Sequence, residues 1–155
     1  MIDSIRYTGI HQARQYINNL DEVELKRTAL ISVREPTCNV EFPYDKIDKS
    51  LILRFDDADS QPVDVLGIGN VYVDFVLFDK SMANSILKFA DELNNSETHY
   101  DLLIHCHAGI SRSAAIQMAL CQKYNRVYDS KYTLYNKLVY NTLMKNYLQG
   151  IIDAL

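Results

Sequence analysis

Short apolar runs bounded by polar or turn residues recur along the chain and predict buried strands. The clearest are "ALISV" (29–33), "SLILRF" (50–55) and "DLLIHC" (101–106). Each is short and rich in bulky apolar residues, as is typical of strands that are covered on both faces. A further short strand is expected at 4–8.

Apolar residues at three- and four-residue steps between these runs predict helices. The clearest helix spans 79–93, where Met82, Ile86 and Leu93 fall on one face and Asp79 is a suitable N-cap. Helices are also expected at 9–20, 111–124 and 130–150. The last of these would place the following residues on one face and end at Gly150: Leu134, Leu138, Val139, Thr142, Leu143 and Tyr147.

Strands that alternate with helices predict an α/β domain with a mainly parallel central sheet and helices on both faces. Ligands bind such sheets beyond the carboxyl ends of the strands. Both Cys106 and the acidic cluster that follows 50–55 fall at such ends. The stretch 61–78 fits no element clearly, because its apolar residues suit either a strand-like excursion or a covering loop.

Length, charge and cysteine usage narrow the class of protein. The 155 residues suit a single domain, 1–155, and the net charge of −4 argues against nucleic acid or an anionic membrane as the main partner. We see no basic stretch followed by an apolar run at the start, and no apolar run of roughly 20 residues. Three cysteines form no disulfide framework. These features predict a cytoplasmic protein with free thiols.

The stretch "HCHAGISRS" (105–113) follows a predicted strand and opens a predicted helix. Backbone amides at a helix N-terminus point inward and attract an anion. Gly109 allows the loop to turn, and the planar guanidinium of Arg112 can bind two phosphate oxygens. A cysteine in this cradle would ionise below the usual pKa of about 8.5, and Ser113 could donate a hydrogen bond to its sulfur. Cys106 is therefore a candidate nucleophile for a phosphoryl group.

These residues match the signature H-C-x-x-G-x-x-R followed by Ser or Thr, so roughly residues 29–148 resemble the dual-specificity branch of the protein tyrosine phosphatase superfamily. The resemblance implies a protein phosphatase that hydrolyses phosphotyrosine, and in some members phosphoserine and phosphothreonine, through a phosphocysteine without a cofactor or metal. It implies that Cys106, Arg112, Asp57 and Ser113 are catalytic and that His105 orients the loop. The substrate-binding residues it implies are His107, Ala108, Gly109, Ile110, Ser111 and Arg112.

The general acid is an aspartate from a separate loop in that superfamily. Aligning "LILRFDD" with the corresponding strand of dual-specificity phosphatases places Asp57 at the position of the general acid, with Asp59 as the second candidate. The separation between Asp57 and Cys106 is longer than is usual for the branch, so Asp74 also stays open.

Other interpretations of the same loop involve other substrates or no chemistry. A lipid or RNA phosphatase is less favoured, because no lysine lies between Cys106 and Arg112 and the net charge is negative. A rhodanese-like sulfurtransferase also places a cysteine in an anion-binding loop, and a module that only binds phosphate is the remaining alternative. His11 and His99 have no partners at ligand spacing, so no metal site is expected.

Overall fold

Four parallel strands form the central sheet of this protein, whose computed structural model describes residues 1–60 and 74–155. Their order across the sheet is β1-β4-β2-β3. The strands are β1 (Ile2–Gly9), β2 (Thr28–Arg34), β3 (Lys49–Arg54) and β4 (Tyr100–Cys106). All four predicted strands are therefore confirmed, and β4 lies inside the sheet with β1 and β2 as its neighbours.

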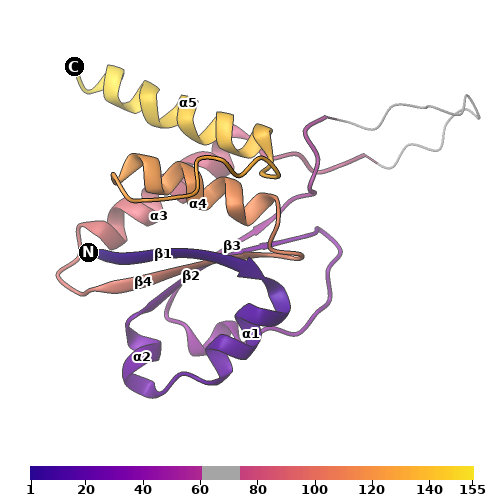
Figure 1. The fold of residues 1–155 in the computed structure, drawn as a ribbon, viewed down its shortest axis with the longest axis vertical. Helices are drawn as coiled ribbons and strands as arrows, with labels where there is room; N and C mark the ends of the chain where they lie inside the picture. Colours follow the sequence, from indigo (N-terminus) through magenta and orange to yellow (C-terminus); the bar gives the residue numbers. More distant parts are fainter. Residues whose placement is uncertain (61–73) are drawn as a thin grey trace, which may run out of the picture.

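Helices cover both faces of the sheet (Figure 1). They are α1 (Ile10–Asn18), α2 (Glu22–Lys26), the 3-10 turn η1 (Tyr44–Lys46), α3 (Lys80–Asn94), α4 (Arg112–Lys123) and α5 (Lys137–Asp153). Helices α1 and α2 lie on one face, and α3, α4 and α5 lie on the other. The predicted α/β fold with a parallel sheet between two helical layers is confirmed.

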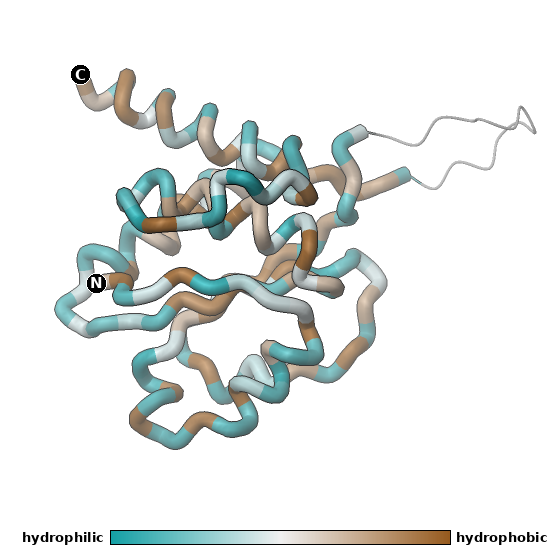
Figure 2. Tube along the Cα trace, viewed as in Figure 1, coloured by the Kyte–Doolittle hydropathy of each residue, from teal (hydrophilic) through white to brown (hydrophobic). Residues whose placement is uncertain are grey.

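The larger apolar core lies between the sheet and α3, α4 and α5. Figure 2 shows hydrophobic segments along the strands and hydrophilic segments in the connections around α1 and α2. Helix α4 is buried on nearly all sides, as expected for a helix without a polar face. Helix α3 begins after Asp79, whose side chain accepts a hydrogen bond from the Met82 amide at 2.9 Å, so the predicted N-cap is confirmed.

The last helix differs from the prediction at both ends. It begins at Lys137, because the Asn136 side chain caps it by accepting a hydrogen bond from the Val139 amide at 3.0 Å. Leu134, predicted on the buried face, is 64% exposed in the segment before this cap. Gly150 does not end the helix, since glycine costs only about 1 kcal/mol within a helix and the apolar Ile151 follows it.

The sequence pattern did not assign helix α2 or the stretch 61–78 to an element. Helix α2 was not expected; it is one short turn stabilised by a capping box between Asp21 and Glu24. Of the uncertain stretch 61–78, residues 61–73 lie outside the described residues, and 74–78 have no regular secondary structure. This second part is held to the end of β3, where Asp56 and Val76 exchange two hydrogen bonds of 2.8 Å.

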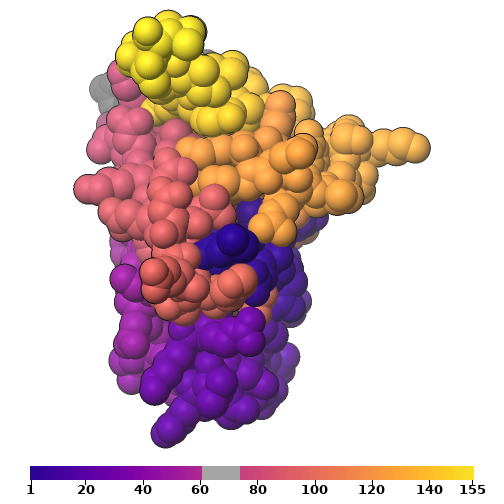
Figure 3. All heavy atoms as spheres, turned by 90° about the vertical axis from the view of Figure 1, so that its left-hand side faces the viewer, coloured from indigo at the N-terminus to yellow at the C-terminus, as the bar shows by residue number. Residues whose placement is uncertain are grey.

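Helix α5 forms the outer layer at one extremity of the molecule (Figures 1 and 3). Its last residues extend beyond the helices beneath it, so that they are exposed. In the part of the chain that the structure describes, no helix combines the length and hydropathy needed to cross a bilayer.

Candidate active site

The loop that follows β4 is shaped by a close approach of two backbones. Gly109 has a φ of +73°, and a Cβ at this position would lie 2.3 Å from the backbone nitrogen of Gly9. Only glycine fits, because both the left-handed conformation and the contact exclude a side chain. The Ile10 amide also donates a hydrogen bond to the His107 carbonyl at 3.1 Å. The junction of β1 and α1 therefore supports the loop from behind.

Cys106 ends β4 and lies at the base of this loop with only 2% of its surface exposed. The Gly109 amide donates a hydrogen bond to its Sγ at 3.2 Å. The hydroxyl oxygen of Ser113, in the first turn of α4, lies 3.1 Å from the same sulfur. Both groups can therefore donate a hydrogen bond to this sulfur.

The guanidinium of Arg112 forms hydrogen bonds with two groups of the protein and is shielded from solvent. Its side chain is buried, with Nη1 donating to the Phe55 carbonyl at 2.8 Å and Nη2 donating to Glu35 Oε1 at 2.6 Å. Nε is buried and has no hydrogen-bond partner among the described residues. Burial raises the pKa of Glu35, but the hydrogen bond from Arg112 and the attraction of its charge outweigh that effect and lower the pKa below its ordinary value. Glu35 is therefore a charged carboxylate, and it holds the guanidinium of Arg112 in place.

Asp57 contacts the loop through Ser111. Its Oδ1 accepts hydrogen bonds from Ser111 Oγ at 2.8 Å and from Asn136 Nδ2 at 2.9 Å. Asp59 lines the same cavity of about 330 Å³, but its described hydrogen bond is a 3.2 Å contact with the neighbouring Ser60. The structure thus brings Asp57 into direct contact with the loop.

Asp74, the third aspartate considered, is exposed. Among the contacts between described residues, none joins it to the loop. Within residues 1–60 and 74–155, no three histidine, cysteine or acidic side chains are grouped so that they could hold a metal ion.

Asn136 joins three parts of the site, although the sequence did not indicate it. Its backbone amide donates to the Ser111 carbonyl at 3.1 Å, and its Nδ2 donates to Asp57 Oδ1 and to the Ala58 carbonyl at 3.3 Å. Its Oδ1 meanwhile caps α5. One buried side chain therefore holds the acidic segment, the loop and α5 together. An asparagine directly before an apolar helical pattern was the available signal.

The remaining loop residues lie at the surface. His107, Ala108 and Ile110 are exposed, whereas Ser111 is partly buried. Tyr132, from the segment before α5, donates its hydroxyl hydrogen to the Ile110 carbonyl at 2.5 Å. That these residues meet a substrate stays a prediction.

His105 is buried behind the loop in a chain of hydrogen bonds. Its Nε2 lies 2.6 Å from Ser32 Oγ, which lies 2.9 Å from the Tyr44 hydroxyl, and that oxygen accepts from Arg34 Nη1 at 3.0 Å. Its Nδ1 lies 3.3 Å from the carbonyl oxygen of Cys106. Each group has one donor and one acceptor when Nδ1 carries the proton and the imidazole is neutral. Burial accordingly lowers the pKa of His105 to about 4.

We expect the neutral state of His105 to make folding stability depend on pH. The unfolded chain binds this proton with a pKa of about 6.5, so between about pH 6.5 and pH 4 the unfolded state holds more protons. Stability therefore falls with falling pH, by about 2 kcal/mol between pH 7 and pH 5. Urea unfolding at the two pH values measures this difference. His105→Gln should reduce it, whereas His11→Gln, an exposed control, should leave it unchanged; equal differences in both variants would contradict the assignment.

Comparison with known proteins shows what this fold is. No family profile matches the sequence, and no curated protein matches it significantly. The structure is similar to that of PTPMT1, solved in complex with PI(5)P, with a TM-score of 0.53 and 17% identity over 98% of this chain and 92% of that one. A human tyrosine phosphatase-like serine/threonine/tyrosine-interacting protein matches with a TM-score of 0.49 and 16% identity, over 81% and 79% of the two chains. The chain has the protein tyrosine phosphatase-like fold.

Proposed function

We propose that the protein is a cysteine-dependent phosphatase that hydrolyses phosphotyrosine in proteins through a phosphocysteine intermediate. The observation that carries the proposal is the position of Cys106 Sγ, buried at the base of a loop whose Gly109 amide already donates to it. Arg112 supports the proposal, because its buried Nε has no acceptor among the described residues and could donate to a phosphate oxygen.

The proposed reaction has two steps, and each uses groups that lie around the loop. In the first, the Cys106 thiolate attacks phosphorus, an S–P bond forms, the P–O bond to the substrate breaks, and Asp57 gives its proton to the departing oxygen. In the second, Asp57 takes a proton from a water molecule that attacks phosphorus, and the S–P bond breaks. Ser113, 3.1 Å from Sγ, then stabilises the thiolate that leaves.

A phosphoinositide is the second candidate substrate, because the similar PTPMT1 was solved in complex with PI(5)P. The loop of this chain offers less to such a ligand, since no lysine lies between Cys106 and Arg112 to meet additional phosphates. Phosphotyrosine, which carries one phosphate, needs only the loop itself.

The test of the proposal is rapid-mixing kinetics with p-nitrophenyl phosphate. We expect a burst of p-nitrophenolate equal to the enzyme concentration, with phosphate held on the protein after an acid quench. Absence of both hydrolysis and a phosphoprotein would refute a catalytic function and leave a module that only binds phosphate. Parallel assays of phosphotyrosine and phosphoserine peptides, a phosphoinositide, and thiosulfate with cyanide would separate the substrate classes.

Asn136 should influence the proposed reaction through Asp57 rather than by contact with the substrate. Asn136→Ala removes the hydrogen bond to Asp57 and the α5 cap, so we expect a loss of about 1 kcal/mol in stability and about tenfold in kcat. Asn141→Ala, an exposed position on the same helix, is the control. Urea unfolding and steady-state kinetics check the two effects. A stability loss without a change in kcat would show that Asn136 serves only as a cap.

A further inference from the structure

The outer face of α5 carries an apolar stripe at its exposed end. Leu148, Ile151 and Ile152 are 52%, 45% and 60% exposed, and their spacing places them on one side of the helix. The two fully buried residues of α5, Val139 and Leu143, lie on the side of the helix that faces the core. Exposed clusters of this kind on a soluble surface mark sites of association.

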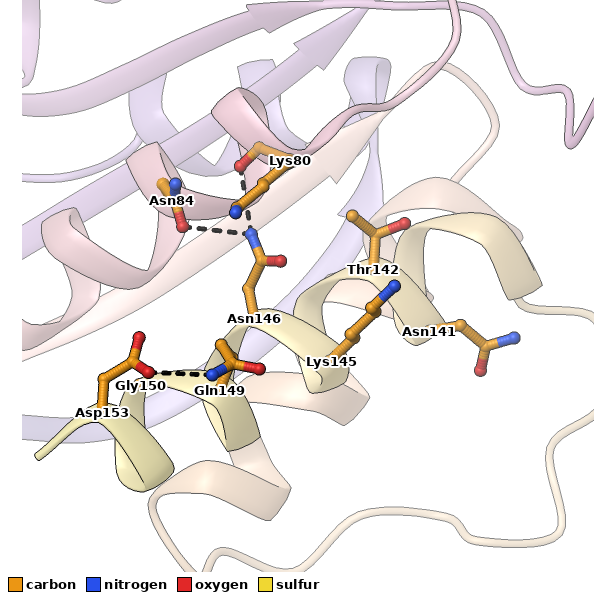
Figure 4. Close-up of a pocket in the computed structure, with 9 residues that line it drawn as sticks. All are labelled: Lys80, Asn84, Asn141, Thr142, Lys145, Asn146, Gln149, Gly150 and Asp153. Carbon is orange, nitrogen blue, oxygen red and sulfur yellow. Dashed lines mark hydrogen bonds between the residues drawn. The ribbon is translucent and has the colours of Figure 1, made fainter. Parts of the chain in front are cut away.

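Charged and amide side chains form a row beside this stripe. Lys145, Gln149 and Asp153 follow one another at four-residue steps along the side of α5 that borders a groove with α3 (Figure 4). Gln149 Nε2 donates to Asp153 Oδ1 at 2.8 Å, while Lys145 forms no ion pair with any described residue. A positive charge thus lies at one end of the row and a negative charge at the other.

This row is complementary to itself when the helix is reversed. If two copies of α5 pack antiparallel about a two-fold axis that passes beside Gln149, residue 145 of one helix lies opposite residue 153 of the other. Lys145 of each copy then faces Asp153 of its partner copy, and the apolar stripes meet between these pairs. We propose that the protein forms a two-fold symmetric dimer through the exposed end of α5.

The size of the surface sets the strength of this dimer. A few half-exposed side chains per copy bury far less than the roughly 800 Å² per partner of a standard stable interface. The dimer is therefore weak and reversible, with a dissociation constant between about 10 and 500 µM.

Sedimentation velocity over that concentration range tests the proposal. The unmodified protein should shift from monomer to dimer, and Ile152→Glu should stay monomeric. Lys145→Asp and Asp153→Lys should each weaken dimerisation about tenfold, because each change acts twice in a symmetric dimer. Circular dichroism controls for folding, which these exposed positions should not affect.

Mixing the two charge variants gives the decisive measurement. In a dimer of one Lys145→Asp copy and one Asp153→Lys copy, each pair of facing residues again joins an aspartate and a lysine. An equal mixture of the two variants should therefore dimerise about as well as the unmodified protein. A monomer at all concentrations, or a mixture no better than its components, would overturn the proposal. If the surface instead bound an anionic vesicle, Lys145→Asp would weaken that binding and Asp153→Lys would strengthen it.

Discussion

Cys106→Ser is expected to lower the hydrolysis of p-nitrophenyl phosphate by about 10⁴-fold or more, to the level of the background reaction. A serine hydroxyl at this position is a far weaker nucleophile than a thiolate, because the Gly109 amide and the Ser113 hydroxyl can stabilise a charged sulfur but do not remove a hydroxyl proton. Initial rates at saturating substrate give the comparison.

The control for this change is Cys121→Ala, which removes another buried thiol on α4, away from the loop. It should retain most of the activity. Binding of inorganic phosphate by Cys106→Ser, measured by calorimetry, should also persist, because Arg112 and the loop amides are unchanged. Equal rates in the unmodified protein and Cys106→Ser would exclude the proposed chemistry.

Asp57→Asn is expected to reduce kcat by about 10² to 10⁴, with a smaller effect on KM. The amide keeps the size of the side chain and can still contact Ser111 and Asn136, but it cannot transfer a proton. Loss of the acid should matter most for a poor leaving group, so the reduction should be larger with phenyl phosphate than with p-nitrophenyl phosphate.

Asp59→Asn provides the matched control, since this carboxylate lines the same cavity without a described hydrogen bond to the loop. We expect less than about a threefold change in kcat, because Asp59 has no part in the proposed proton transfer. If Asp59→Asn were the more damaging change and showed the dependence on leaving group, the roles of the two aspartates would be reversed.

The loop could be predicted from the sequence because its parts are contiguous. Cys106, Gly109, Arg112 and Ser113 lie within eight consecutive residues, between a strand and a helix that are each recognisable from their own pattern. The nine-residue stretch therefore contains the proposed nucleophile, the turn at Gly109 and the proposed anion-binding arginine together. The parallel sheet followed from the alternation of apolar runs with helical segments.

The supporting residues could not be predicted, because distant segments supply them. Glu35 is 77 residues from Arg112, and Asn136 is 79 residues from Asp57. Nothing local distinguishes Glu35 from any other carboxylate in a connection, and only the fold brings it to the guanidinium. The start of α5 was misplaced for a related reason, since the apolar spacing continues through Leu134 and the cap at Asn136 decides the boundary.

The position of β4 between β1 and β2 also has a consequence for how the chain folds. The two neighbours of β4 precede it in the sequence by about a hundred and about seventy residues, so no local pairing can complete the sheet. During synthesis, β1 and β2 each keep an unpaired edge until residues 100–106 have emerged. The strand that closes this gap is the one that ends in Cys106. An incompletely folded chain therefore lacks the loop contacts of Cys106, and this thiol acquires its surroundings only when the sheet is complete.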